Sequence, residues 1–71
     1  MLISSIGSKI KAIREQKNIS QAKLANDSKI TAGYLCELEN GVKNNPSFGV
    51  LQKLATALGV KVSDLLEDQA S

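Results

Sequence analysis

The chain has 71 residues, 42% of them apolar, and its only aromatic residues are Tyr34 and Phe48. Its formal net charge of +2 divides into +4 over residues 1–36 and −2 over residues 37–71. This length and aliphatic composition favour one small all-helical domain spanning residues 1–71, and the charge distribution makes the first half suited to a polyanion. The chain has no histidine, one cysteine and no run of 18 apolar residues, which argues against an enzyme, a metal or other cofactor, an internal disulfide and a membrane span.

The first predicted helix runs from about Ser4 to Lys17. Isoleucine recurs in this segment at spacings of four and three, which places three side chains on one stripe of a helix. These residues are Ile6, Ile10 and Ile13. Asn18 tolerates the left-handed backbone that closes a helix, so we expect the helix to end there.

The second predicted helix is short and begins almost at once. Ser20 can accept a hydrogen bond from the unpaired amides of a first helical turn, which predicts a helix from Gln21 to about Asp27. Leu24 and Ala25 are expected to face the core from this helix.

A third helix follows after a second capping residue. Thr31 can serve as the cap of a helix over Ala32–Asn40, with Leu35 and Leu38 on its buried side. Gly41 then supplies a left-handed stop. Only three or four residues separate this helix from the preceding one, so the two must cross steeply rather than run antiparallel. Such a corner leaves a protruding helix that fits a DNA major groove, which is about 12 Å wide.

The fourth helix is predicted after the loop that contains Pro46. Ser47 is expected to cap it, and Gly59 is expected to end it. Its predicted apolar stripe consists of Phe48, Leu51, Leu54, Ala55 and Leu58.

The last element is predicted to be one or two helical turns. Val60 and Val62 are expected to form a short extended link, and Ser63 is expected to cap the final turns that contain Leu65 and Leu66. The architecture predicted from these segments is five short helices around one core.

Several of these segments, in this order, resemble the Cro and repressor helix-turn-helix family of phages and bacteria. The matching segments are ISQAKLA, ITAGYLCELENG, NNPSFGVLQKLATALGV and SDLL, together with the spaced isoleucine, lysine and arginine of the first helix. The resemblance covers about residues 3–67. It implies a compact five-helix fold like that of lambda repressor and a transcriptional regulator, most simply a repressor, that binds double-stranded DNA.

The resemblance places the base-contacting residues on the outward face of the third helix. They are Thr31, Ala32, Gly33 and Glu37. Ala32 can offer only a methyl contact, and Gly33 lets the helix approach closely, so neither can read a base by hydrogen bonds. Glu37 can only accept, which makes cytosine N4 its natural partner. The alternative for Glu37 is a solvated charge that tilts out of the groove.

The resemblance also implies contacts to the DNA backbone. These fall to Ser20, Gln21, Tyr34, Asn40, Lys43, Asn44, Asn45 and Ser47. For Ser20 the alternative is a cap alone, for Gln21 a solvent-exposed side chain, and for Tyr34 a packing role. Asn44 and Asn45 are neutral where some relatives are basic, so their contacts should position the protein rather than strongly attract it.

One pair of residues and one turn residue have structural meaning in the family. Arg14 and Glu39 match a pair that family members join as a partly buried ion bridge between the first and third helices. Lys29 departs from the family, which usually has glycine in this turn. If the backbone of Lys29 is left-handed, its side chain costs about 1 kcal/mol.

The family mechanism implies a homodimer that places two copies of the third helix in successive major grooves, about 34 Å apart, on a near-palindromic operator. Four apolar residues near the end of the chain are either interface residues or core residues: Val60, Val62, Leu65 and Leu66. The alternative function is an antitoxin or an adaptor that uses the same domain to bind a protein partner.

The expected location is the cytoplasm. A single cysteine within a predicted helix suits a compartment with reduced thiols. The first residues, MLISSIGSK, lack the basic start, the apolar run and the cleavage site of a secretory leader.

Overall fold

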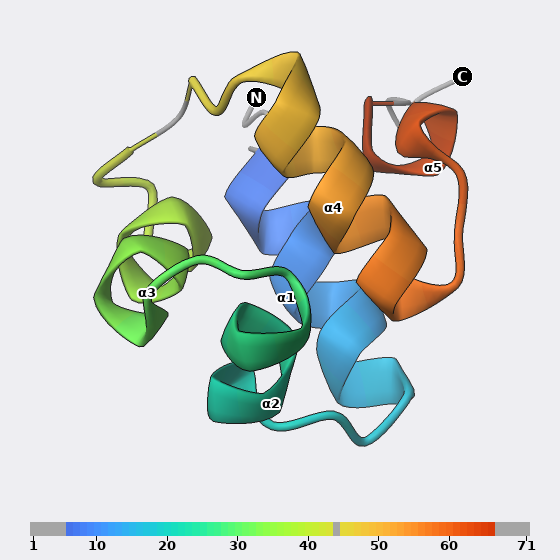
Figure 1. Cartoon of the computed structure of the whole chain (residues 1–71), viewed down its shortest axis with the longest axis horizontal. Coiled ribbons are helices and arrows are strands. Elements are labelled where there is room, and N and C mark those ends of the chain that lie inside the picture. Colours follow the sequence, from blue (N-terminus) through green and yellow to red (C-terminus); the bar gives the residue numbers. More distant parts are fainter. Residues whose placement is uncertain (1–5, 44, 67–71) are drawn as a thin grey trace.

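The computed structural model describes residues 6–43 and 45–66, and these residues form five helices. The helices are α1 (Ile6–Gln16), α2 (Gln21–Asp27), α3 (Ala32–Glu39), α4 (Phe48–Leu58) and α5 (Val62–Leu66). Figure 1 shows α1 and α4 in the middle of the molecule. The short helices α3, at the left, and α2, at the bottom, are joined by a loop and form a corner. None of the helices in this described part of the chain is long and apolar enough to cross a membrane.

The predicted helix starts are confirmed where a hydroxyl residue precedes the helix. Ser20, Thr31 and Ser47 each have extended backbone, and each side-chain oxygen accepts a hydrogen bond from the backbone N–H three residues later, at 3.0, 3.0 and 3.2 Å. Each bond satisfies one of the amides that a helix start leaves unpaired. Local capping chemistry therefore accounts for the starts of α2, α3 and α4.

The ends of the first four helices share one geometry. Each is followed by a residue with a positive φ, and the next residue donates its N–H to the carbonyl five positions earlier. The left-handed residues are Asn18, Lys29, Gly41 and Gly59, and the donors are Ile19, Ile30, Val42 and Val60. Three of these donors, all except Val42, also pack their apolar side chains against the core. The predicted stops at Asn18, Gly41 and Gly59 are thus confirmed.

The turn between α2 and α3 contains a strained lysine, with φ of 58° at Lys29. Replacing Lys29 with glycine is expected to raise the free energy of unfolding by about 0.5–1 kcal/mol, because glycine adopts this conformation without a Cβ penalty. Urea unfolding followed by circular dichroism would measure the change. The matched control is Asn18→Gly at the same φ, for which we expect a change near zero since asparagine tolerates left-handed backbone. Destabilisation by Lys29→Gly would contradict the prediction.

The core is aliphatic and receives side chains from all five helices. Its buried members are Ile10, Leu24, Ala25, Leu35, Leu38, Leu51, Leu54, Ala55, Leu58 and Leu65. Ile6 and Ile13 of the predicted first stripe are partly buried against this core. The residues predicted to point inward from α2 and α3 are all buried.

One contact between α1 and α3 is closer than side chains normally permit. Gly7 is buried in α1, and a Cβ added to it would lie 1.6 Å from the carbonyl oxygen of Leu38 in α3. Only a residue without a side chain fits there. This contact brings the end of α3, including the backbone of Leu38 and Glu39, close to α1.

The apolar stripe predicted for α4 was wrong at Phe48. Its ring is 62% exposed, whereas the other four residues of the stripe are buried. Phe48 is the first residue of α4, and in Figure 1 this first turn lies at the edge of the molecule. Helical spacing places Phe48 on the stripe, but none of the other described helices covers this first turn of α4 enough to bury the ring.

The predicted start of the last helix was also wrong. Val62 is the first residue of α5 and not part of an extended link, so Ser63 does not cap the helix. Instead, the side chain of Asp64 accepts a hydrogen bond from the backbone N–H of Lys61 at 3.0 Å. A carboxylate three residues inside the helix thus satisfies an amide at its start, as in one half of a capping box.

Candidate nucleic-acid interface

The first turn of α3 is not covered by any other part of the described chain. Thr31, Ala32 and Gly33 are all exposed, and no heavy atom lies within 4 Å of the position that a Cβ on Gly33 would take. Thr31 uses its oxygen as a hydrogen-bond acceptor for the cap, so its hydroxyl proton can still be donated outward. The residues predicted to contact bases at the start of α3 are therefore accessible to a large ligand.

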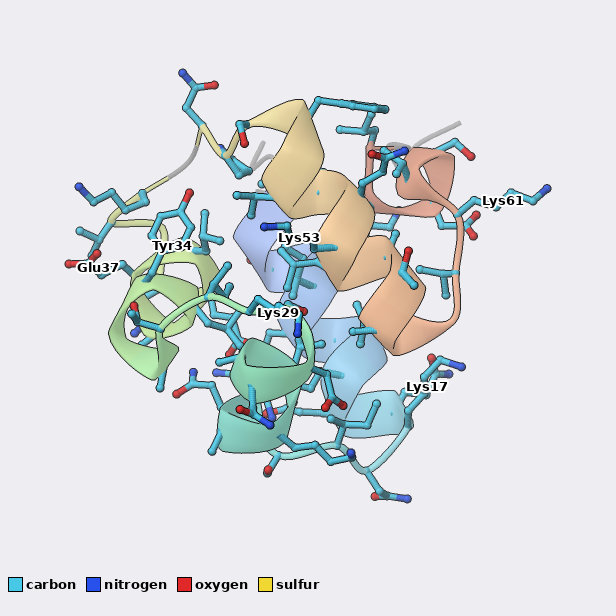
Figure 2. All side chains as sticks on the ribbon, viewed as in Figure 1. Lys17, Lys29, Tyr34, Glu37, Lys53 and Lys61 are labelled. Carbon is cyan, nitrogen blue, oxygen red and sulfur yellow. The ribbon has the colours of Figure 1, made fainter. Side chains whose placement is uncertain are left out.

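Tyr34 and Glu37 lie one turn and nearly two turns along the helix from Thr31. In Figure 2, Glu37 lies at the outer edge of α3, on the side away from α4, and Tyr34 lies between Glu37 and α4. Both side chains are half-buried, and Tyr34 packs against the core. The packing role considered for Tyr34 is therefore present, while its position on α3 also leaves the ring partly accessible.

The segment that follows α3 is exposed. Asn40, Lys43, Asn45 and Ser47 have accessible side chains, and Asn44 lies outside the described residues. Asn40 donates from Nδ2 to the sulfur of Cys36 at 3.3 Å, which leaves its side-chain oxygen as an acceptor. The described residues of this segment adjoin the exposed face of α3 in sequence and can extend it along a nucleic-acid backbone.

Ser20 and Gln21 differ in their surroundings at the start of α2. Ser20 is exposed and caps the helix, whereas Gln21 is half-buried. Gln21 donates from Nε2 to Oε1 of Glu39 at 3.0 Å, a bond between α2 and α3. The alternative of a fully solvent-exposed Gln21 is therefore wrong, because the carboxylate of Glu39 holds its amide.

The ion pair between α1 and α3 is bidentate. Arg14 donates from Nε to Oε2 of Glu39 at 2.7 Å and from Nη2 to Oε1 at 3.0 Å. The side chains are only 11% and 2% exposed. The hydrogen bond to Glu39 is the main cause that raises the pKa of Arg14, although burial acts in the opposite direction. Arg14 is thus committed to the fold and is not available as a phosphate contact.

The apolar residues near the end of the chain have different surroundings. Leu65 is 1% exposed and belongs to the core, so it is no longer an interface residue. Val60 and Val62 are half-buried against the core, and Leu66 is 58% exposed. Leu66 is therefore the most accessible of the four predicted positions.

Two features of this region were not predicted from the sequence. The close approach at Gly7 could not be recognised, because glycine within a helix has many explanations and the position of α3 was unknown. The bond from Gln21 to Glu39 joins residues 18 positions apart, and no local pattern indicates it.

The sequence profile of the helix-turn-helix family matches residues 10–65. The chain belongs to the helix-turn-helix family. Among curated relatives, the immunity repressor protein of Bacillus phage phi105 is 34% identical over 92% of this chain and 44% of the relative. Control protein C.BamHI of Bacillus amyloliquefaciens is 39% identical over 86% of this chain and 75% of the relative. The resemblance to Cro and repressor proteins is confirmed.

Solved structures agree with this assignment. SinR, the master regulator for biofilm formation, in complex with DNA is 35% identical, with a TM-score of 0.84 over 87% of this chain and 98% of that chain. SinR in complex with the SinI protein is 34% identical, with a TM-score of 0.86 over 92% of this chain and 63% of that chain. The chain spans about half the length of the first curated relatives, 44% of the phage repressor and 58% of SinR from Bacillus subtilis. The five-helix fold is therefore that of helix-turn-helix DNA-binding domains.

Proposed function

We propose that the chain is a sequence-specific regulator of transcription that binds double-stranded DNA and acts as a repressor. The observation that carries this proposal is the uncovered first turn of α3, where Thr31, Ala32 and Gly33 are all exposed. A helix that projects in this way can enter a major groove. The likeness to SinR, which was solved in complex with DNA, supports the same function.

The exposed residues of α3 would then contribute to base recognition in different ways. Ala32 and Gly33 let the helix approach the base edges closely, and the methyl group of Ala32 can contact thymine. Glu37 can accept a hydrogen bond from cytosine N4, and a base without a donor would leave its carboxylate unpaired. Glu37 would thus discriminate between base pairs mainly by disfavouring those that offer it no hydrogen-bond donor.

The contacts to the DNA backbone come mostly from neutral groups. We assign them to Ser20, Gln21, Tyr34, Asn40, Lys43, Asn44, Asn45 and Ser47, of which only Lys43 is a cation. Neutral donors fix the register of a protein on the duplex but release no counterions. The salt dependence of binding should therefore be shallow, with about one phosphate neutralised by these residues in each half-site.

We propose a homodimer on a near-palindromic operator, because one small module buries too little surface for high specificity. Two copies of α3 would occupy major grooves about 34 Å apart. Leu66 is the exposed apolar residue of α5 that a twofold interface could cover. A protein of this kind acts where DNA is accessible, so we place it in the cytoplasm, and we assign it no catalytic reaction.

A protein-partnered adaptor is the second candidate function, supported by the SinR structure that contains the SinI protein. In that case, the purified chain should require a protein partner before it binds an operator. Binding of an operator by the pure protein, weakened by salt, favours the first function.

Two substitutions test the proposed roles at the interface. Glu37→Ala is expected to relax the preference at one operator position, where discrimination between bases should fall by about 1–3 kcal/mol. Gln21→Ala is expected to weaken binding about equally on all operators, because it removes a backbone contact. Selection of bound sites from random DNA, followed by titration of single-base variants, would measure both effects.

One further measurement tests the dimer, and two outcomes would contradict the proposed roles or the proposed function. Sedimentation of the purified protein with the selected duplex reports whether two copies bind. Equal losses on every operator for both variants would mean that Glu37 does not read a base. Failure of the native protein to select any sequence at low salt would overturn the proposed function itself.

A further inference from the structure

The buried pair of Arg14 and Glu39 extends to a residue of the proposed DNA interface. Oε1 of Glu39 accepts two hydrogen bonds, from Nη2 of Arg14 and from Nε2 of Gln21, both at 3.0 Å. Its other oxygen accepts from Nε of Arg14 at 2.7 Å. A single carboxylate from α3 therefore binds a side chain of α1 and a side chain of α2.

The carboxylate of Glu39 determines which end of the Gln21 side-chain amide faces it. A carboxylate paired with a guanidinium only accepts hydrogen bonds, so the NH₂ group of Gln21 must turn toward it. One N–H of Nε2 is used in this bond, and the second N–H is available to another acceptor. A phosphate oxygen is such an acceptor, and it cannot bond to the carbonyl oxygen of the same amide.

Arg14 also holds the chain just before Gln21. Its Nη1 donates to the carbonyl oxygen of Ile19 at 2.9 Å, and the N–H of Ile19 donates to the carbonyl of Arg14 at 3.0 Å. Three of the five N–H groups of the guanidinium thus have acceptors in Glu39 and Ile19. The pair constrains both the side chain of Gln21 and the backbone two residues before it.

We propose that Arg14 and Glu39 are positioning residues for DNA binding, in addition to their role in the fold. They hold the Gln21 amide with one N–H turned toward the phosphate backbone before DNA arrives. A long side chain that is ordered in advance loses less conformational freedom on binding. This inference rests on the proposed function, specifically on the backbone contact assigned to Gln21.

The test uses a variant that removes the pair without leaving a buried charge. Arg14→Met combined with Glu39→Leu replaces the two groups by apolar side chains, an exchange that proteins often tolerate. Circular dichroism would first establish that the double variant melts cooperatively. Binding to the selected operator would then be measured at one fixed salt concentration, with and without Gln21→Ala in each background.

We expect the losses of DNA affinity caused by the double variant and by Gln21→Ala to overlap rather than add. The double variant should bind about fivefold more weakly than the native protein, within the range for ordering one long side chain. Gln21→Ala should weaken the native protein by about five- to tenfold, so that it weakens the double variant by less than about twofold. Replacing the contacted phosphate by a neutral methylphosphonate should weaken the native protein and have little further effect on the double variant.

A second measurement needs no substitution in the network. In the native protein without DNA, the side-chain NH₂ of Gln21 should have an NMR order parameter near the rigid value of about 0.85. The exposed Gln16 and Gln52 are the internal controls, and their amides should fall below about 0.6. This measurement remains decisive if the double variant does not fold.

Several outcomes would overturn the inference. Native affinity in the folded double variant would mean that the pair only stabilises the fold. An equal cost of Gln21→Ala in both backgrounds, or a Gln21 amide as mobile as those of Gln16 and Gln52, would mean that the pair does not position it. If Gln21→Ala leaves native binding unchanged, the assigned contact is wrong although DNA binding stands. If the native protein binds no DNA, the proposed function fails as well.

Discussion

Replacing Glu39 with glutamine is expected to lower the free energy of unfolding by about 3 kcal/mol. The substitution keeps the volume of the side chain but removes its charge, so the buried guanidinium of Arg14 keeps only the exposed carboxylate of Glu15, 3.9 Å from Nη2, as a counterion. The side chain of Glu39 is 2% exposed, and water therefore cannot replace the lost partner. For a domain of this size, such a loss is a large part of the total stability.

Glu15 offers a matched control on the same arginine. Its carboxylate lies 3.9 Å from Nη2 of Arg14, but its side chain is 59% exposed. Exposed ion pairs are worth little, so Glu15→Gln should change the free energy of unfolding by less than about 0.5 kcal/mol. Urea unfolding of both variants measures the difference. Similar small effects for the two substitutions would mean that Glu39 is solvated in the folded protein.

The stabilisation by this pair should not vary with pH over the neutral and moderately alkaline range. The hydrogen bond to Glu39 raises the pKa of Arg14. A base with a raised pKa contributes stability below its unfolded pKa and loses it only as the pH rises through the folded pKa. Both values lie far above neutrality because arginine is a very strong base. The charge of Arg14 is therefore constant wherever the protein would be studied.

Replacing Gly7 with alanine is expected to lower the free energy of unfolding by about 3 kcal/mol, at the upper end of the range for overpacked sites. The new methyl group would lie 1.6 Å from the carbonyl oxygen of Leu38, so α1 and α3 must separate. This separation also strains the pair of Arg14 and Glu39, which joins the same two helices. The expected sign is opposite to the usual effect of alanine in a helix.

Gly33 is the matched control for this substitution. It also lies in a helix, but nothing is within 4 Å of its Cβ position. Gly33→Ala should therefore raise the free energy of unfolding by about 0.5–1 kcal/mol, through helix propensity alone. Thermal and urea unfolding without DNA would measure both variants. Stabilisation by Gly7→Ala as well would mean that α1 and α3 do not approach this closely.

The amino-acid sequence by itself determined the helices and most of their ends. Ser20, Thr31 and Ser47 accept hydrogen bonds from backbone amides three residues away. Residues with left-handed backbone, such as Gly41, end a helix, and the hydrogen bond that accompanies each end joins residues five positions apart. These interactions depend only on near neighbours in the chain, so pattern and chemistry are enough to locate them. The same local order of segments also carried the resemblance to the helix-turn-helix family.

Tertiary structure alone decided which residues meet across the molecule. The exposure of Phe48, the lack of space at Gly7 and the bond from Gln21 to Glu39 all depend on where a second helix lies. Helical spacing gives the direction of a side chain but not the position of its neighbour. The chain identifies residues that can face DNA, and the packing of α1 against α3 decides how firmly one of them, Gln21, is held.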